Sequence, residues 1–245
     1  MKITVDTHTH TIASDHSYST VTEMARMASE VGLEGIAITD HGIAMDDSPH
    51  DWYFGNLKNI PREIFGVKML YGIEANILDE KGNIDPLSEE LYKKLDIVNA
   101  SIHGPCYSFE GDDHTETYYN IVKNPLVDIL GHSGTDKYKY DYETIVKLAR
   151  DENKLIEINN HSYYARRASM PNCKKIAELC KKYGTGIVVS SDAHICFDLG
   201  KYDKAFELLE EVDFPEELIM NRDFETLSEF FKAKGKPFFR WNAGE

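Results

Sequence analysis

The sequence is poor in cysteine and has none of the cysteine patterns that mark a disulfide scaffold or a thiolate metal site. Its 245 residues include four cysteines, and no two of them are spaced as CxxC. Cys173 and Cys180 fall about two turns apart on one predicted helix, which is too far for a disulfide. We therefore expect reduced thiols and a reducing compartment, the cytoplasm.

Long apolar runs and excess positive charge are also missing. No stretch of about 18 apolar residues occurs, and the first residues, Met-Lys-Ile-Thr-Val-Asp, lack the apolar core of a signal peptide. The formal net charge is −15, from 42 acidic and 27 basic residues. We therefore expect neither a nucleic-acid partner nor a membrane partner. An anionic substrate stays possible, because bound divalent cations reverse the charge locally.

What the sequence does contain is a regular alternation of apolar strands and amphipathic helices. The predicted strands are 2–7, 35–39, 68–77, 96–101, 127–130, 155–158 and 186–189. The predicted helices are 21–31, 87–94, 115–123, 141–152, 172–183, 201–212 and 223–234, while 43–59 is expected to be a long loop. Such alternation predicts a parallel α/β sheet with crossover helices. No linker divides the chain, so we expect one domain over 1–245.

The first predicted strand carries the most informative polar residues. Side chains on a strand alternate between its faces, so Asp6, His8 and His10 are expected to point the same way. Two imidazoles placed like this can bind one metal ion, and a nearby carboxylate can orient a ring nitrogen. A half-buried strand with its polar residues facing solvent would show the same pattern, so this pair alone decides nothing.

All the candidate ligands, His8 and His10 included, lie at or near the carboxyl ends of the predicted strands, and together they include seven of the ten histidines. In a βα barrel these ends meet on one face, which is where active sites form. Imidazoles and carboxylates without thiolates suit zinc, manganese or iron(II). This set has more ligands than one ion needs, and a carboxylate can bridge two ions. The candidate ligands are His8, His10, His16, His41, Glu74, His103, His132, Asp192 and His194.

These residues stand in motifs that resemble those of the PHP (polymerase and histidinol phosphatase) family, and especially its YcdX-like phosphatase branch. The segments that carry the resemblance are Asp6-Thr7-His8-Thr9-His10, Thr39-Asp40-His41-Gly42, His132, Glu157-Ile158-Asn159-Asn160, Ser191-Asp192-Ala193-His194 and Val212-Asp213-Phe214-Pro215. The resemblance implies a distorted (β/α)7 TIM-like barrel, a trinuclear metal site and phosphoesterase activity.

The resemblance also implies how the ligands are shared among three divalent transition-metal ions, for which zinc is preferred over manganese or iron. The first ion would be bound by His8, His10, Glu74 and Asp192. The second would be bound by His103, His132 and the bridging Glu74. The third would be bound by His16, His41 and His194. Asp6 and Asp40 are expected to support these ligands through hydrogen bonds.

The expected mechanism is in-line attack on phosphorus by a hydroxide that two of the ions activate near Glu74 and Asp192. Arg166 and Arg167 are candidate phosphate contacts, because a guanidinium matches phosphate oxygens with two donors. A solvated surface position is an equal alternative for Arg167. His161 is a candidate for substrate contact or for protonating the leaving group.

The preferred reading is a phosphatase that acts on a small phosphomonoester. A phosphodiesterase or nuclease is an alternative, because PHP domains also occur in polymerase proofreading, although the negative charge argues against it. Amidohydrolase barrels also begin with HxH, but they commonly use a bridging lysine on the fourth strand, where this chain has none. A non-catalytic metal-binding protein is a further alternative.

Overall fold

The computed structural model of the protein describes residues 1–238 and contains one sheet of seven parallel strands. Their order in space is their order in the chain: β1 (Val5–Thr9), β2 (Gly35–Ile38), β4 (Val67–Asn76), β5 (Ile97–Ser101), β6 (Ile129–Leu130), β7 (Leu155–Asn159) and β8 (Ile187–Ser190). A short strand, β3 (Glu63–Ile64), pairs antiparallel with the start of β4.

The two edge strands, β1 and β8, approach each other and nearly close the sheet into a barrel. At the carboxyl end of β1 and just past that of β8, Thr9 and Ala193 form a parallel bridge, and the backbone N–H of His10 donates to the carbonyl of Ala193 at 2.9 Å. Near the opposite end, the Asn221 amide donates to the carbonyls of Val5 and Val189 at 2.7 and 2.6 Å. The predicted fold class, a distorted (β/α)7 barrel, is confirmed.

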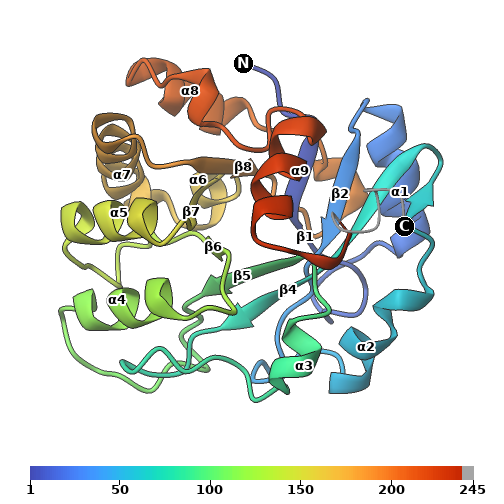
Figure 1. The fold of residues 1–245 in the computed structure, drawn as a ribbon, viewed down its shortest axis with the longest axis horizontal. Coiled ribbons are helices and arrows are strands. Elements are labelled where there is room, and N and C mark those ends of the chain that lie inside the picture. Colours follow the sequence, from blue (N-terminus) through green and yellow to red (C-terminus); the bar gives the residue numbers. More distant parts are fainter. Residues whose placement is uncertain (239–245) are drawn as a thin grey trace.

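The helices surround the strands (Figure 1). They are α1 (Val21–Glu30), α2 (Asp51–Asn56), α3 (Glu89–Tyr92), α4 (Thr115–Lys123), α5 (Tyr142–Asp151), α6 (Ser162–Ala165), α7 (Met170–Tyr183), α8 (Asp203–Glu211) and α9 (Phe224–Ala233). None of the helices in the described part of the chain has the length and apolar character needed to cross a membrane.

Local sequence explains where several of these helices begin. Thr20 and Glu23 form a capping box at the start of α1, in which each side chain accepts from the other residue's backbone N–H. The segment 43–59 was predicted to be a long loop, but part of it forms the short helix α2. The ring of His50 accepts from the N–H of Trp52 and so caps that helix.

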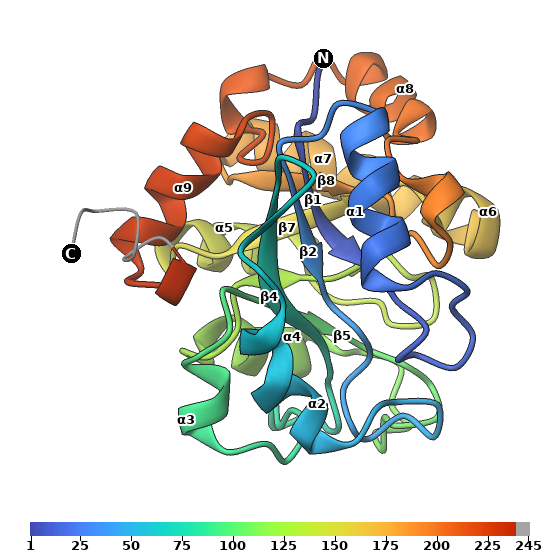
Figure 2. The same ribbon diagram turned by 90° about the vertical axis from the view of Figure 1, so that its right-hand side faces the viewer.

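The interior of the barrel is apolar at the end where the strands begin. Every parallel strand contributes one buried side chain there: Val5, Ala37, Leu70, Ile97, Ile129, Leu155 and Val188. Helix α9 lies across this end (Figure 2) and adds Leu227 and Phe231. Since apolar side chains fill this end, the space for a ligand lies at the other, where the strands finish.

Candidate metal centre

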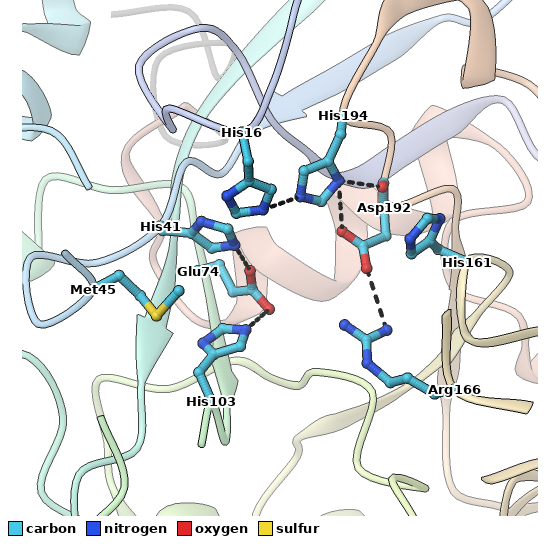
Figure 3. A pocket seen from close by; sticks show the side chains of 9 residues that line it. All are labelled: His16, His41, Met45, Glu74, His103, His161, Arg166, Asp192 and His194. Atoms are coloured by element: carbon cyan, nitrogen blue, oxygen red, sulfur yellow. Dashed lines mark hydrogen bonds and ion pairs between the residues drawn. The ribbon is translucent and has the colours of Figure 1, made fainter. Parts of the chain in front are cut away.

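A cavity of about 350 Å³ opens at the carboxyl end of the barrel (Figure 3). The loops after β1, β2, β5 and β8 bring histidines to it, and β4 contributes a carboxylate from within the strand. The residues that line it are His16, His41, Met45, Glu74, His103, His161, Arg166, Asp192 and His194. Most of the predicted site residues therefore lie on or beside one cavity.

The Glu74 carboxylate lies at the centre of this cluster and is 1% exposed. Its two oxygens face different imidazoles, each through Nε2: Oε2 lies 3.1 Å from His41, 3.3 Å from His8 and 3.5 Å from His10, and Oε1 lies 2.9 Å from His132 and 3.4 Å from His103. Burial favours the neutral acid, but His8 and His103 outweigh it and hold the pKa of Glu74 well below its usual range.

Asp192 and His194 approach the same cluster from the loop after β8. One carboxylate oxygen of Asp192 lies 3.2 Å from Nε2 of His10 and 3.6 Å from Nδ1 of His194. On the opposite edge of the His194 ring, Nε2 lies 2.9 Å from Nε2 of His16. Two imidazole nitrogens that point at each other in this way are arranged as ligands of a shared cation would be.

The backbone is strained at two of the candidate ligands. His132 has φ +24° and Asp192 has φ +53°, in a region that residues other than glycine seldom occupy. Such strain costs on the order of 1–3 kcal/mol and persists where the surrounding structure enforces it, often at functional sites. Both residues come just after a strand, and their side chains reach other candidate ligands, Glu74 for His132 and His10 for Asp192.

Glu157 orients a candidate ligand, a role that the sequence did not reveal. It lies on β7, where it accepts from Nδ1 of His8 at 2.7 Å and from the backbone N–H of His132 at 2.6 Å. This leaves Nε2 of His8 facing Glu74. Burial disfavours the charged imidazole, but Glu157 and Glu74 outweigh it and raise the pKa of His8 well above its usual range. A charged residue within the apolar run Leu-Ile-Glu-Ile was the signal available.

The carboxylate of Asp6 contacts the backbone of His8 and not an imidazole nitrogen. Its carboxylate accepts from the backbone N–H groups of His8 and Ser191 and from the hydroxyl of Tyr202. The pairing register of β1 shifts between Asp6 and Thr9, which breaks the strict alternation on which the prediction relied. Burial raises the pKa of Asp6 to about 6, although these hydrogen bonds oppose the increase.

Asp40 supports the centre by holding a loop in place, and its carboxylate forms hydrogen bonds with groups other than the imidazole rings. Its carboxylate accepts from the backbone N–H and the hydroxyl of Thr11, at 2.7 and 2.8 Å, and from the hydroxyls of Ser14 and Tyr53. These bonds fix the chain that follows β1 and carries His16.

Asn76 orients a ring directly, because its side-chain oxygen lies 2.7 Å from Nδ1 of His103.

Several buried imidazole nitrogens at the centre have no hydrogen-bond partner within residues 1–238. They are Nε2 of His8, both ring nitrogens of His10 and Nδ1 of His41. A buried polar atom left unpaired costs about 1–3 kcal/mol, so such a group of them is uncommon in a folded protein. Four sets of donor atoms here lie within 4.8 Å of one another, as metal ligands must: His8 with His10 and Glu74, His10 with His41 and His194, His41 with Glu74 and His103, and His16 with His41 and Asp47. The donor set thus fits divalent metal ions.

The candidate substrate residues differ in position. Arg166 lines the cavity, and its guanidinium lies 3.6 Å from an oxygen of Asp192. His161 also lines it, with its ring stacked on that of His194 at 5.8 Å between centroids. Arg167 is exposed and does not belong to the described residues that line the cavity. The structure therefore brings Arg166 and His161 to the centre but not Arg167.

Comparison with known proteins gives close relatives along nearly the whole chain. It is 48% identical over 238 residues to a probable phosphatase of Clostridium novyi, covering 96% of this chain and 97% of the relative. It is 49% identical over 235 residues to a probable phosphatase of Acetivibrio thermocellus, with the same coverage. These names agree with the predicted class of enzyme, a phosphatase.

A solved structure and a family model complete the comparison. The histidinol phosphate phosphatase of Lactococcus lactis, complexed with zinc, L-histidinol and phosphate, aligns with a TM-score of 0.61 at 19% identity. The alignment covers 86% of this chain and 94% of that one, and at this identity it speaks for the fold. The model of the PHP domain matches residues 6–161. The chain therefore belongs to the PHP domain family, as its motifs predicted.

Proposed function

We propose that this protein is a metal-dependent phosphatase that hydrolyses a small phosphomonoester at a centre of three divalent transition-metal ions. The observation that carries the proposal is the Glu74 carboxylate, whose two oxygens face separate sets of imidazoles. A carboxylate presented in this way suits the role of a bridge between two ions, which an imidazole seldom fills. We also propose that residues 1–245 form one domain, and that its four free thiols reflect a reducing, cytoplasmic location.

The proposed ligands of the three ions are shared as the family resemblance implies, and contacts among the described residues support this sharing. His8, His10, Glu74 and Asp192 would bind the first ion, and Glu74, His103 and His132 the second. His16, His41 and His194 would bind the third. A set of imidazoles with two carboxylates favours zinc, with manganese and iron(II) as alternatives. The zinc in the Lactococcus lactis protein supports that order.

Different residues would act on the reacting water, on the phosphate and on the leaving group. When bound, the ions would lower the pKa of a water and neutralise negative charge on the phosphate. Arg166, beside Asp192 in the cavity wall, would add a guanidinium donor to the phosphate oxygens. His161 faces the same cavity and would donate a proton to the departing alcohol oxygen.

The size of the cavity supports a small substrate. A volume of about 350 Å³ lies near the lower end of the range for small-molecule sites. Much of that space would be taken by the ions and the phosphate, which leaves room for a compact alcohol. The net charge of −15 also disfavours a polyanionic nucleic acid.

The test is hydrolysis of an aryl phosphate monoester and of the matching diester, each with zinc, manganese or iron(II) added to protein purified without chelator. The comparison is between wild type, Glu74→Ala and Glu90→Ala, a change at an exposed glutamate of α3. We expect monoester turnover in wild type and Glu90→Ala and a loss of more than 100-fold in Glu74→Ala, beyond the roughly 10- to 100-fold cost of removing a residue that only supports a ligand.

Each other outcome points away from the proposal. Turnover of the diester alone would indicate a phosphodiesterase. Bound metal without turnover of either ester would indicate a non-catalytic protein or a hydrolase of another bond. Full activity in a folded Glu74→Ala variant would contradict the central role of that carboxylate.

A further inference from the structure

The loop between β2 and α2 contains an aspartate, Asp47, that touches two candidate ligands of the third ion. We propose that Asp47 positions His16 and His41 and thereby sets the affinity for that ion. This inference rests on the metal centre of the proposed function and assigns a role to a residue outside the motifs. It predicts that removing the Asp47 side chain weakens the binding of one of the three ions and leaves the binding of the other two unchanged.

The contacts of Asp47 reach both histidines at once. One carboxylate oxygen, Oδ2, accepts a hydrogen bond from Nδ1 of His16 and lies 3.8 Å from Nδ1 of His41. The backbone carbonyl of Asp47 also accepts from the N–H of Asp15 at 3.0 Å. Asp47 therefore links the loop that carries His16 to the chain just after His41, through both its side chain and its backbone.

The other nitrogen of each ring faces the cavity (Figure 3). Nε2 of His41 lies 3.1 Å from Glu74, and Nε2 of His16 lies 2.9 Å from Nε2 of His194. A neutral imidazole has one N–H and one lone pair, so a carboxylate at Nδ1 fixes the N–H there and leaves Nε2 to bind a metal. Glu157 holds Nδ1 of His8 in the same way.

His16 needs such support more than the other candidate ligands. Its side chain is 49% exposed, whereas that of His194 is 21% exposed and those of His8 and His10 are fully buried. Packing holds the buried rings in place, but a half-exposed imidazole is free to rotate. The hydrogen bond to Asp47 restricts the orientation of His16 from its Nδ1 side.

A direct ligand role for Asp47 is the competing explanation. Donor atoms of His16, His41 and Asp47 lie within 4.8 Å of one another. An ion bound there through both Nδ1 atoms would give up their Nε2 lone pairs, because a neutral imidazole binds through one nitrogen. The Nε2 atoms already face Glu74 and His194, so the geometry favours positioning.

The experiment compares wild type, Asp47→Ala, Asp47→Asn and Asp46→Ala, which removes the same charge from an exposed neighbour in the same loop. Each protein is saturated with zinc and freed of excess metal, its zinc content is measured, and its affinities are determined by competition with a chromophoric chelator. We expect three ions in wild type and in Asp46→Ala. In Asp47→Ala the weakest site should bind about 10- to 100-fold less tightly, with the other two unchanged.

Asp47→Asn separates positioning from ligation. Its amide oxygen can still accept from Nδ1 of His16, so positioning predicts an affinity between those of wild type and Asp47→Ala. An affinity as low as that of Asp47→Ala would assign Asp47 as a ligand and overturn the inference. The melting temperatures of the metal-free Asp47→Ala and Asp46→Ala proteins should agree, and a lower value for Asp47→Ala alone would indicate a general structural role instead.

The remaining outcomes distinguish this inference from the proposed function. Three ions held with wild-type affinity in Asp47→Ala would overturn the role of Asp47 alone. Wild-type protein that binds three ions but hydrolyses no phosphate ester would contradict the proposed function and leave the role of Asp47 standing. Wild-type protein that binds fewer than three ions would contradict both.

Discussion

The two ends of the barrel both bury charged and polar groups, but they satisfy them differently. Where strands begin, Asp96 forms an ion pair with Arg62, Asp128 is paired with two lysines, and Lys154 donates to backbone carbonyls. Where strands end, ring nitrogens of His8, His10 and His41 have no hydrogen-bond partner within residues 1–238. Within residues 1–238, the charged groups at the first end are held by ion pairs and hydrogen bonds, whereas the second end leaves imidazole nitrogens without a hydrogen bond.

This difference shows which observation identifies a site. Burial of charge occurs at both ends, so burial alone does not mark function. Unpaired metal-binding atoms that converge on a common point do mark a functional site. Leaving them without partners costs free energy on folding, and a bound ligand offsets that cost. The comparison predicts that changes at the first end alter stability and that changes at the second alter metal binding and turnover.

The largest expected effect is at the paired end. In Asp128→Asn, Lys234 and Lys236 lose their carboxylate while remaining only 15% and 13% exposed. Breaking a buried ion pair costs about 3–5 kcal/mol, so the free energy of unfolding should fall by that amount in urea titrations. Zinc content should stay that of wild type. Asp112→Asn, at an exposed aspartate, is the control. A loss of zinc in Asp128→Asn would contradict the claim that changes at this end affect stability and not metal binding.

Metal loading should stabilise the protein through the open end. At a free zinc concentration 100 times the Kd, one site adds about 2.7 kcal/mol to the free energy of unfolding. In a chain of this length each kcal/mol raises Tm by about 2–4 °C, so calorimetry of loaded and metal-free protein would show the shift. Glu74→Ala should lose most of it. Equal Tm values for loaded and metal-free wild type would count against a metal site.

The two adjacent arginines should differ in their effect on turnover. Arg166 lines the cavity and Arg167 is exposed. A hydrogen bond to a charged group contributes about 1.5–3 kcal/mol, so Arg166→Ala should lower kcat/KM for a phosphate monoester by about 10- to 100-fold. Arg167→Ala should stay within about twofold, as exposed substitutions usually do. Steady-state kinetics decide, and equal losses in both variants would refute the assignment of Arg166.

The smallest expected effect is at Glu157. In Glu157→Gln the remaining oxygen can still accept from Nδ1 of His8, while the charge and the second oxygen, which accepts from the backbone N–H of His132, are lost. Removing support from a metal ligand costs about 10- to 100-fold in affinity, and we expect the lower figure here. A chelator competition assay on this variant and on Glu178→Gln, at an exposed glutamate of α7, measures it. Unchanged affinity would show that Glu157 serves only the fold.

Much of this could be predicted from the sequence because the evidence for it is local. Apolar runs predicted all seven parallel strands, and residues at strand ends indicated the cavity. The one-turn helix α6 was missed because four residues carry no periodicity. The register shift in β1 was missed because it depends on pairing with β2. The orienting partners were missed because they are distant in the chain: Glu157 is 149 residues from His8, and Asp47 is 31 from His16.

The most direct test of the central claim is a crystal structure of zinc-loaded protein with anomalous data at the zinc edge. The account predicts three anomalous peaks in the cavity, with the Glu74 carboxylate between two of them and the third among His16, His41 and His194. A cavity without anomalous peaks in zinc-saturated crystals, or zinc bound only elsewhere on the protein, would contradict it.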